Sequence, residues 1–185
     1  MPSKTPVARK MFFVTGKGTH KHQLVSFEAA LRDAGIAHFN LVYVSSIYPP
    51  GCKIITAAEG LKGLKAGQIV HCVMARIDTN EPSRRITSAL GLAIPAEPNQ
   101  YGYISEHHAY GISEEDGEEY AEDLAATMLA TTLGIEFDPD DAWNERKQVY
   151  QASGRIFRTQ AWSTSAEGSE EGLWTTVIAA AVFVA

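Results

Sequence analysis

Two adjacent serines, Ser45 and Ser46, end an apolar run and stand just before Pro49-Pro50. A hydroxyl beside its own upstream peptide carbonyl is the minimal equipment for a chain to cut itself. Attack of the Ser46 hydroxyl on the Ser45 carbonyl would turn the amide into an ester. Loss of the Ser46 α-proton would then release Ser45 as a carboxylate and leave dehydroalanine. Hydrolysis of dehydroalanine gives ammonia and a pyruvoyl group, an electrophilic carbonyl that no ordinary side chain supplies.

The same residues also have a purely structural explanation. A serine pair at a strand end commonly forms a turn whose hydroxyls bond the nearby backbone, and a double proline commonly stops a strand. The serine pair by itself therefore leaves self-cleavage and turn formation as alternatives. The residues around it must decide between them.

Two carboxylates are candidates for further chemistry. Glu106 lies inside the apolar-rich run Tyr101-Gly-Tyr-Ile-Ser-Glu106, where a carboxylate packs poorly. It is either a surface-facing strand position or a partly desolvated acid with a raised pKa, suited to giving a proton to a reacting carbon. Glu28 stands between Phe27 and Ala29, and the polar edge of an amphipathic helix explains it.

Other candidate motifs favour structure over chemistry. Gly16-Lys17-Gly18-Thr19 lacks the spacing of a phosphate-binding loop, and we expect a glycine turn between a strand and a helix. His20 and His22 present no common ligand face, and the adjacent His107-His108 point to opposite sides of a strand. Cys52 and Cys72 are too few for a disulfide framework or a zinc site. We therefore expect no bound metal.

Composition limits the classes of protein to which the chain can belong. It has 185 residues, 45% hydrophobic and 21% charged, which is typical of a single soluble domain spanning 1–185. A net charge of -6 argues against a nucleic-acid partner. The apolar runs near both ends are too short for a signal peptide or a membrane span. With two reduced thiols, these observations predict a cytoplasmic protein without a membrane partner.

The elements that must position these residues can be predicted from periodicity. The pattern predicts a helix over Gln23–Ala34 ended by Gly35, and a second from Ser113 to Leu133 ended by Gly134. A loop is expected over Lys53–Gly67, and a turn at Asp138-Pro139-Asp140-Asp141. The strands are expected at Met11–Thr15, Asn40–Ser45, Gln68–Asp78, Arg84–Pro95, Tyr101–Tyr110, Arg155–Ser163 and Leu173–Val184, with Gln68–Asp78 and Arg84–Pro95 as neighbours joined by Thr79-Asn80-Glu81-Pro82. This mixture predicts an α+β or sandwich fold.

Most of the chain resembles the pyruvoyl-dependent arginine decarboxylases. The strongest match is Asn40-Leu-Val-Tyr-Val-Ser45-Ser46-Ile-Tyr-Pro49-Pro50, preceded by Phe27-Glu28-Ala-Ala-Leu31-Arg-Asp-Ala-Gly35-Ile36. Later matches are Ile86-Thr-Ser-Ala-Leu-Gly-Leu-Ala-Ile-Pro95, Gly102-Tyr-Ile-Ser-Glu106, and Ala166-Glu-Gly with Ala179-Ala-Ala-Val-Phe183. The segment through Lys10 and the region Asp138–Ala152 match weakly.

The resemblance implies a role for each matching residue. Ser45 and Ser46 would flank the cleaved bond, giving chains 1–45 and 46–185, and Ser46 would become the covalent pyruvoyl cofactor. Asn40 would hydrogen-bond near that bond, and Glu106 would reprotonate the product carbon. Glu28 falls where the family has an aspartate facing the substrate guanidinium. Here the acid is one methylene longer.

The resemblance also implies a fold and a reaction. The fold would be a four-layer αββα sandwich, with three protomers sharing active sites and trimers often pairing. The substrate would be L-arginine, which forms a Schiff base with the pyruvoyl group and is released as agmatine after loss of carbon dioxide. A pyruvoyl decarboxylase of another amino acid, and an uncleaved non-enzymatic scaffold of the same fold, are the alternatives.

Overall fold

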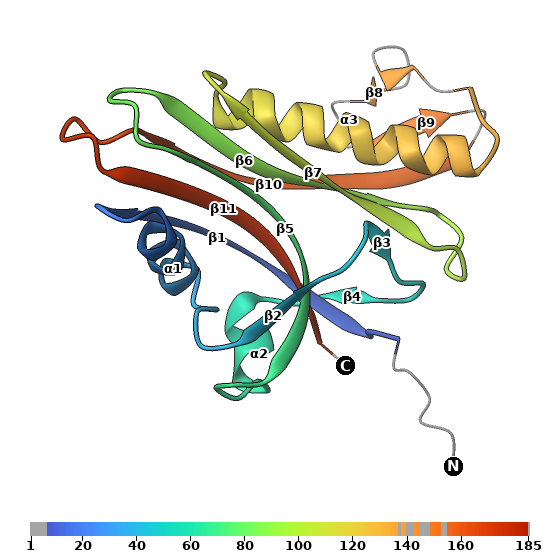
Figure 1. Ribbon diagram of the computed structural model, residues 1–185. Coiled ribbons are helices and arrows are strands. Elements are labelled where there is room, and N and C mark those ends of the chain that lie inside the picture. Colours follow the sequence, from blue (N-terminus) through green and yellow to red (C-terminus); the bar gives the residue numbers. More distant parts are fainter. Residues whose placement is uncertain (1–6, 137, 140–142, 145–148, 153–154, 185) are drawn as a thin grey trace.

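The computed structural model describes residues 7–136, 138–139, 143–144, 149–152 and 155–184, and these form two β-sheets and three α-helices (Figure 1). The first sheet has the strand order β2-β5-β11-β1-β4. Its strands are β1 Lys10–His20, β2 Asn40–Tyr43, β4 Lys53–Ile54, β5 Ile69–Thr79 and β11 Trp174–Val184. The long strands β1, β11 and β5 pair antiparallel, whereas the short strands β2 and β4 pair parallel to β5 and β1.

The second sheet has the strand order β3-β7-β6-β10-β9-β8. All its strand pairs are antiparallel. Its strands are β3 Ile47–Tyr48, β6 Arg85–Ile94, β7 Gly102–Tyr110, β8 Trp143–Asn144, β9 Val149–Ala152 and β10 Arg155–Glu167. Among the described residues, β3 pairs with Gly102 and Tyr103 and the Ser46 carbonyl bonds to Ile104, so the part of β7 after Ile104 is a free edge of this sheet.

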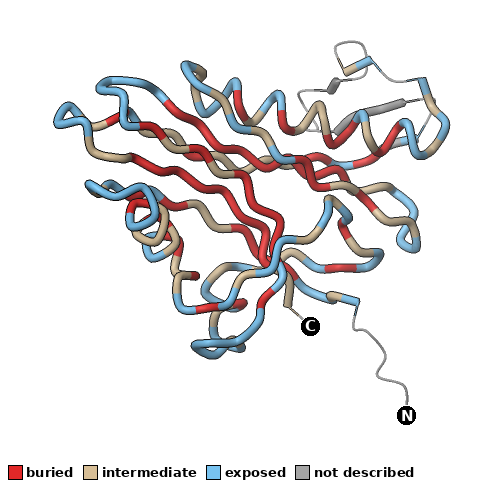
Figure 2. Tube along the Cα trace, in the orientation of Figure 1, coloured by how far each residue is buried: buried red, intermediate tan, exposed pale blue. Residues whose placement is uncertain are grey.

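The two sheets face each other, and each outer face carries helices. Helices α1 (Gln23–Asp33) and α2 (Ala57–Lys62) lie on the first sheet, and α3 (Glu114–Thr132) lies on the second (Figure 1). The layers therefore run helix, sheet, sheet, helix. The buried residues lie between the two sheets and between each sheet and the helices that cover it (Figure 2).

Strand β1 shows why its sequence is continuously apolar. Met11 and Phe13 point into the core between the sheets, where Phe13 stacks on Trp162 with ring centroids 3.4 Å apart. Phe12 points the other way, into the core beneath α1 and α2. A strand covered on both faces has no solvent face to alternate with, so a run of apolar residues is expected there.

The expected turn at Gly16-Lys17-Gly18-Thr19 is wrong, since these residues continue β1 to His20. The glycines are needed because α1 packs directly against the strand. A Cβ on Gly16 would lie 2.1 Å from the Ala30 carbonyl oxygen, and one on Gly18 would lie 2.3 Å from that of Ser26. Glycine here permits close contact between helix and strand, not a change of direction.

Two further expectations need correction. Residues 69–79 and 85–94 do form consecutive strands, but β5 and β6 belong to opposite sheets and meet only across the sandwich. The stretch Lys53–Gly67, expected as a loop, contains β4 and the helix α2, which Thr56 caps by accepting from the Glu59 amide. The expected turn at Asp138–Asp141 lies partly outside the described residues.

Both long helices confirm the predictions from capping signals. Helix α1 ends at Asp33 and is followed by Gly35 with φ +75. Helix α3 begins after Ser113, whose hydroxyl and backbone exchange hydrogen bonds with Asp116, and it is followed by Gly134 with φ +65. Within the described residues, no helix combines the length and hydropathy needed to cross a bilayer.

Candidate active site

The Ser45–Ser46 peptide bond lies where the chain passes from one sheet to the other. On its N-terminal side the Val44 amide donates to the Cys72 carbonyl of β5, 3.0 Å away, in the first sheet. On its C-terminal side the Ser46 carbonyl accepts from the Ile104 amide of β7, 2.8 Å away, in the second sheet. Both flanks are therefore fixed to different sheets, and the serine pair spans the gap between them.

The segment that follows the serine pair is held by its own hydrogen bonds. The Ile47 amide donates back to the Ser45 carbonyl at 3.0 Å, and the Cys52 amide donates to the Pro49 carbonyl at 3.1 Å. The buried hydroxyl of Tyr48 donates to the Cys52 carbonyl. Burial raises the pKa of Tyr48 to about 12, so the hydroxyl remains a hydrogen-bond donor at neutral pH.

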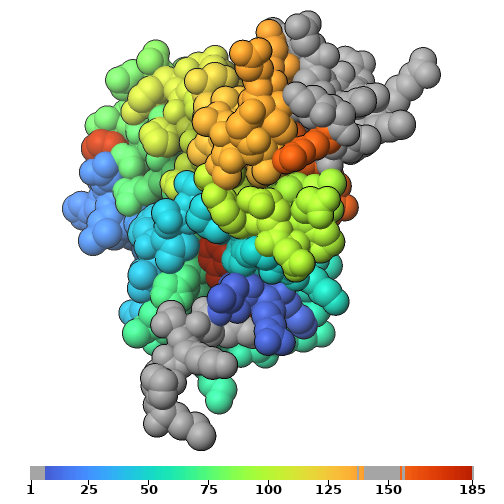
Figure 3. Space-filling view, turned by 90° about the vertical axis from the view of Figure 1, so that its right-hand side faces the viewer, coloured from blue at the N-terminus to red at the C-terminus, as the bar shows by residue number. Residues whose placement is uncertain are grey.

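A pocket of about 330 Å³ opens beside Ser45. Figure 3 shows this face, with the end of β11 in red at the bottom of a hollow between the N-terminal strand and the segment around Ser45. The lining residues are mostly apolar: Val7, Ala8, Val44, Ser45, Ile47, Pro49, Pro50 and Phe183. This lining contains no carboxylate, so the described part of one chain does not provide there the countercharge that a guanidinium requires.

Glu106 lies on the free edge of β7 and points toward the space between the sheets. It shares a face with Ile104, which is buried in the core, whereas Ser105 and His107 face α3. Glu106 is exposed, yet partial burial raises the pKa of its carboxyl, an effect that the nearby His108 reduces. The sequence allowed a surface position or a partly desolvated acid, and Glu106 has features of both. It lies at the edge of the space between the two sheets, partly open to solvent.

The negative charge of Glu106 contributes to the raised pKa values of two residues in the first sheet. Burial raises the pKa of Cys72 to about 11, and the negative charge of Glu106 adds to this. The pKa of Tyr43 is also raised, first by burial and in smaller part by Cys72 and Glu106. Cys72 belongs to β5, and Tyr43 is the last residue of β2, separated from the serine pair by Val44 alone.

The other two predicted site residues lie elsewhere in the chain. Asn40 begins β2, so about 13 Å of extended strand separates it from Val44. Its side-chain amide donates to the Gly67 carbonyl at 2.7 Å. Glu28 lies on α1 and forms an ion pair with Arg32 one turn later. Within the part of the chain that the structure describes, no hydrogen bond joins Asn40 or Glu28 to the serine pair.

Comparisons with known proteins then decide the family. The family described as "Pyruvoyl-dependent arginine decarboxylase" matches residues 10–185. A protein of that name from Methanococcoides burtonii is 60% identical over 178 residues, which is 96% of this chain and 99% of the relative. The chain belongs to the pyruvoyl-dependent arginine decarboxylase family.

Two further relatives show how evenly the similarity extends. "Pyruvoyl-dependent arginine decarboxylase 2" from Methanosarcina acetivorans is 60% identical over 178 residues, covering 96% of this chain and 97% of the relative. "Probable pyruvoyl-dependent arginine decarboxylase" from Chloroherpeton thalassium is 59% identical over 180 residues, covering 97% and 99%. Membership of this family implies a covalently bound pyruvoyl group.

The residues at the crossover fit such a group. Ser46 supplies a hydroxyl next to the Ser45 carbonyl, and hydrogen bonds hold the backbone on both sides. Within the described residues there is no cluster of three or more His, Cys, Asp or Glu side chains that could hold a metal ion. The Ser46 hydroxyl and the Ser45 carbonyl are the two groups from which a pyruvoyl group could be made at this position.

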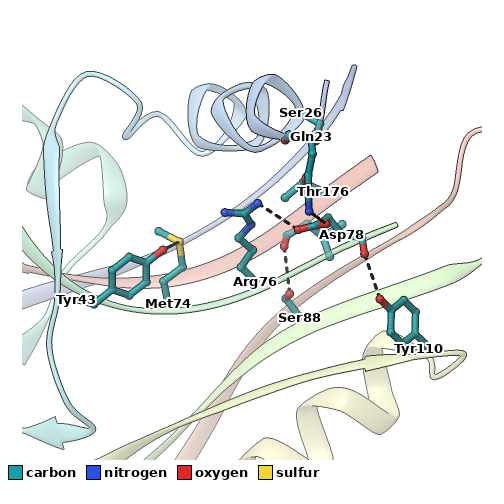
Figure 4. A network of polar contacts seen from close by, with 10 residues as sticks. Gln23, Ser26, Tyr43, Met74, Arg76, Asp78, Ser88, Tyr110 and Thr176 are labelled. Carbon is teal, nitrogen blue, oxygen red and sulfur yellow. Dashed lines mark hydrogen bonds and ion pairs between the residues drawn. The ribbon is translucent and has the colours of Figure 1, made fainter. Parts of the chain in front are cut away.

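A polar network near the free edges of β5 and β7 was missed by the sequence analysis (Figure 4). Arg76 of β5 lies 3.8 Å from the Phe27 ring centroid and pairs with Asp78 at 3.1 Å. Gln23 of α1 also donates to Asp78 at 2.5 Å. The signal was available, because Arg76 interrupts an apolar strand as Glu106 does. The network fixes α1 to the edge of the first sheet.

Proposed function

We propose that this protein converts L-arginine into agmatine and carbon dioxide, using a pyruvoyl group that it makes from Ser46 by cutting the Ser45–Ser46 bond. The observation that carries the proposal is the position of that bond. It is a short bridge between two sheets, fixed on both sides by backbone hydrogen bonds. The products would be a chain of residues 1–45 and a pyruvoyl-bearing chain of residues 46–185.

Self-cleavage takes three steps. The Ser46 oxygen adds to the Ser45 carbonyl carbon, its proton passes to the departing nitrogen, and the amide becomes an ester. Removal of the Ser46 α-proton forms a carbon–carbon double bond and expels Ser45 as a carboxylate. Water then converts the resulting dehydroalanine into the pyruvoyl group and ammonia.

Decarboxylation of arginine needs an electron acceptor and a proton donor. The pyruvoyl group supplies an electrophilic carbonyl that accepts the electron pair left when the carboxylate departs. Glu106 delivers a proton to the carbon that lost the carboxylate. Its raised pKa, caused by partial burial, keeps more of the carboxyl protonated near neutral pH. Within one chain the Asn40 side chain bonds to the Gly67 carbonyl, so its proposed hydrogen bond near the cleaved bond is to that of a neighbouring copy.

Glu28 is proposed to bind the guanidinium of the substrate. A buried guanidinium needs a carboxylate partner, and a bidentate pair is the favoured geometry. The structure contains such a pair, since Nε and Nη2 of Arg32 donate to the two carboxylate oxygens of Glu28. The Arg32 side chain is 74% exposed, and such exposed pairs are weak, so a substrate guanidinium can displace it.

The active site is proposed to be shared between copies in a trimer, with trimers able to pair. Within one chain Glu28 lies on the outer face of the first sheet, whereas Ser46 lies at the crossover between the sheets. A second copy is needed to bring a carboxylate to the apolar pocket beside Ser45.

Cys52 and Cys72 are both free and buried, which suits the reducing cytoplasm, where we expect the enzyme to work.

Intact mass under denaturing conditions tests the proposal. The wild-type chain should yield two fragments, one ending at Ser45 and one beginning with a pyruvoyl group at position 46. Ser46→Ala should stay whole and release no carbon dioxide from arginine, whereas Ser45→Ala should still be cut. A whole wild-type chain that is active would refute the proposal. Measuring the carbon dioxide released from arginine, lysine, ornithine and aspartate tests which amino acid is the substrate.

A further inference from the structure

We infer that the backbone N–H of Ile47 stabilises the oxyanion that forms when Ser46 attacks the Ser45 carbonyl. This inference rests on the proposed self-cleavage and names the group that assists it. The Ile47 amide donates to the Ser45 carbonyl oxygen at 3.0 Å, and this is the oxygen that becomes negatively charged during the attack. It is the one hydrogen bond to that oxygen in the described part of the chain.

The contact closes a tight turn around the nucleophile itself. A hydrogen bond from residue 47 to residue 45 defines a γ-turn with Ser46 at its centre. Among the described residues Ser83 is the only non-glycine with a positive φ, so Ser46 adopts the inverse form of this turn. The turn therefore fixes the backbone at Ser46 and places the Ile47 N–H on the carbonyl that the Ser46 hydroxyl attacks.

The charge moves to the atom that this N–H already contacts. As the Ser46 Oγ–carbon bond forms, the electron pair of the carbonyl π bond moves onto the Ser45 oxygen. A donor that is in place before the reaction stabilises this charge without further rearrangement. The neighbouring pocket walls, formed by Val44, Ile47 and Pro49, are apolar, which strengthens an electrostatic contact compared with water.

In the described part of the chain, the one hydrogen bond that the Ile47 N–H makes is to the Ser45 carbonyl, and the pairing of β3 with β7 does not require it. Ile47 pairs with Tyr103, but the hydrogen bond between these strands runs from the Ile104 amide to the Ser46 carbonyl. In an antiparallel pair the groups of the intervening residue point away from the partner strand. The Ile47 N–H therefore points away from β7, and its removal leaves the pairing of β3 with β7 intact.

Replacing this one amide by an ester tests the inference. Incorporation of 2-hydroxy-3-methylpentanoic acid at position 47 removes the N–H and keeps the side chain. The same replacement at Ile55 is the matched control, because its amide donates to the Met11 carbonyl at 2.8 Å, away from Ser45. Cleavage is followed after cell-free synthesis by quenching timed samples in denaturant and measuring intact mass, which also identifies the bond that breaks.

We expect the ester at position 47 to slow the cut between residues 45 and 46 by about 10²- to 10³-fold, as for loss of one oxyanion donor. The ester at position 55 should leave the rate close to that of the unmodified chain. Equal rates for both esters would overturn the inference. An unmodified chain that stays whole would instead refute the proposed self-cleavage.

A folding defect is separated from a chemical one by two further proteins. Neither Ser46→Ala nor Ser46→Ala with the ester at position 47 can be cut, so their unfolding temperatures show what the ester does to folding alone. We expect both to fold, and the ester to cost about 0.5–1.5 kcal/mol for the lost hydrogen bond. If the ester prevents folding, Ile47→Pro carries the test, since proline also lacks the N–H and is tolerated in edge strands, although it also shifts Ser46 away from the γ-turn. Rapid cutting of a folded Ile47→Pro chain would contradict the role of this N–H.

Discussion

Glu106 is the residue whose chemistry depends most on its surroundings. Partial burial raises the pKa of its carboxyl, and His108 reduces the shift. A proton donor must be protonated, so activity should fall as pH rises through this raised pKa. Glu106→Gln should lower kcat by about 10²- to 10⁴-fold and remove that descending limb of the pH profile of kcat. Steady-state rates measured across pH would show both effects.

The corresponding control is Glu115→Gln, which neutralises an exposed carboxylate on α3. It should leave both kcat and the pH profile unchanged. Both variants should still be cut at Ser45–Ser46, as seen on a denaturing gel. A Glu106→Gln enzyme that is cut and keeps its rate at all pH values would exclude Glu106 as the proton donor.

Glu28 should determine affinity more than rate. Loss of a charge-assisted hydrogen bond costs about 1.5–3 kcal/mol, so Glu28→Ala should raise the KM for arginine by about 10- to 150-fold. Arg32→Ala frees the same carboxylate from its intrahelical partner and should not raise KM. Steady-state kinetics of the two variants, with Glu28→Asp as the conservative one, would separate these effects. An unchanged KM in Glu28→Ala would reject the assignment.

The sequence could suggest which residues carry chemistry, but it could not indicate which residues they contact. The serine pair and Glu106 break the pattern of their strands, so composition and alternation reveal them. The bond from Asn40 to the Gly67 carbonyl joins residues 27 apart through a loop, and no local pattern encodes it. Likewise, the rim position of Glu106 results from the pairing of β3 with only the start of β7.

At the scale of elements, the glycines of β1 set the distance between α1 and the first sheet. Gly18→Ala would place a Cβ 2.3 Å from the Ser26 carbonyl oxygen, so the helix must move. We expect a loss of about 1–3 kcal/mol in the free energy of unfolding. For a chain of this size each kcal/mol corresponds to about 2–4 °C in Tm, which calorimetry would resolve.

Gly63→Ala serves as the control for that substitution. Gly63 has φ -87, and the nearest heavy atom to an added Cβ is 3.9 Å away. It should leave Tm unchanged or raise it slightly, because alanine reduces the freedom of the unfolded chain. If Gly18→Ala were as stable as Gly63→Ala, the close approach of α1 to β1 would not be what requires glycine.

Local signals determine which helices and strands could be predicted from the sequence. Helices α1 and α3 carry local signals, including the capping box at Ser113 and the glycines that follow each helix. Strand β1 could not be bounded, since glycine is read as a turn former unless the helix that it contacts is known. The assignment of β5 and β6 to opposite sheets depends on their partners, which are distant in the chain.

At the scale of the whole molecule, the proposed cut divides the chain without dividing the fold. Residues 1–45 contribute β1 and β2 to the first sheet, where β5 and β11 lie between them. The N-terminal piece therefore surrounds two strands of the other piece, and α1 packs on β1 and β11. Hydrogen bonds and apolar burial would hold the two proposed products together, so the new end at residue 46 would stay at the crossover.

The shared active site can be tested by mixing two defective chains. Ser46→Ala removes the cofactor, and Glu28→Ala weakens substrate binding. If Ser46 of one copy faces Glu28 of the next, random mixed trimers carry both native residues at about a quarter of their interfaces. Co-expressed variants, assayed at arginine far below the KM of Glu28→Ala, should then exceed the activity of either variant alone.

Mixing the same two variants after separate purification provides the control, because assembled copies that do not exchange cannot form the mixed interface. Light scattering of the co-expressed sample would verify that it has the mass of an oligomer. If Glu28 instead served Ser46 of its own chain, every site in the mixture would lack one of the two residues, and activity would not exceed that of Glu28→Ala alone. That result would place the complete active site within a single chain.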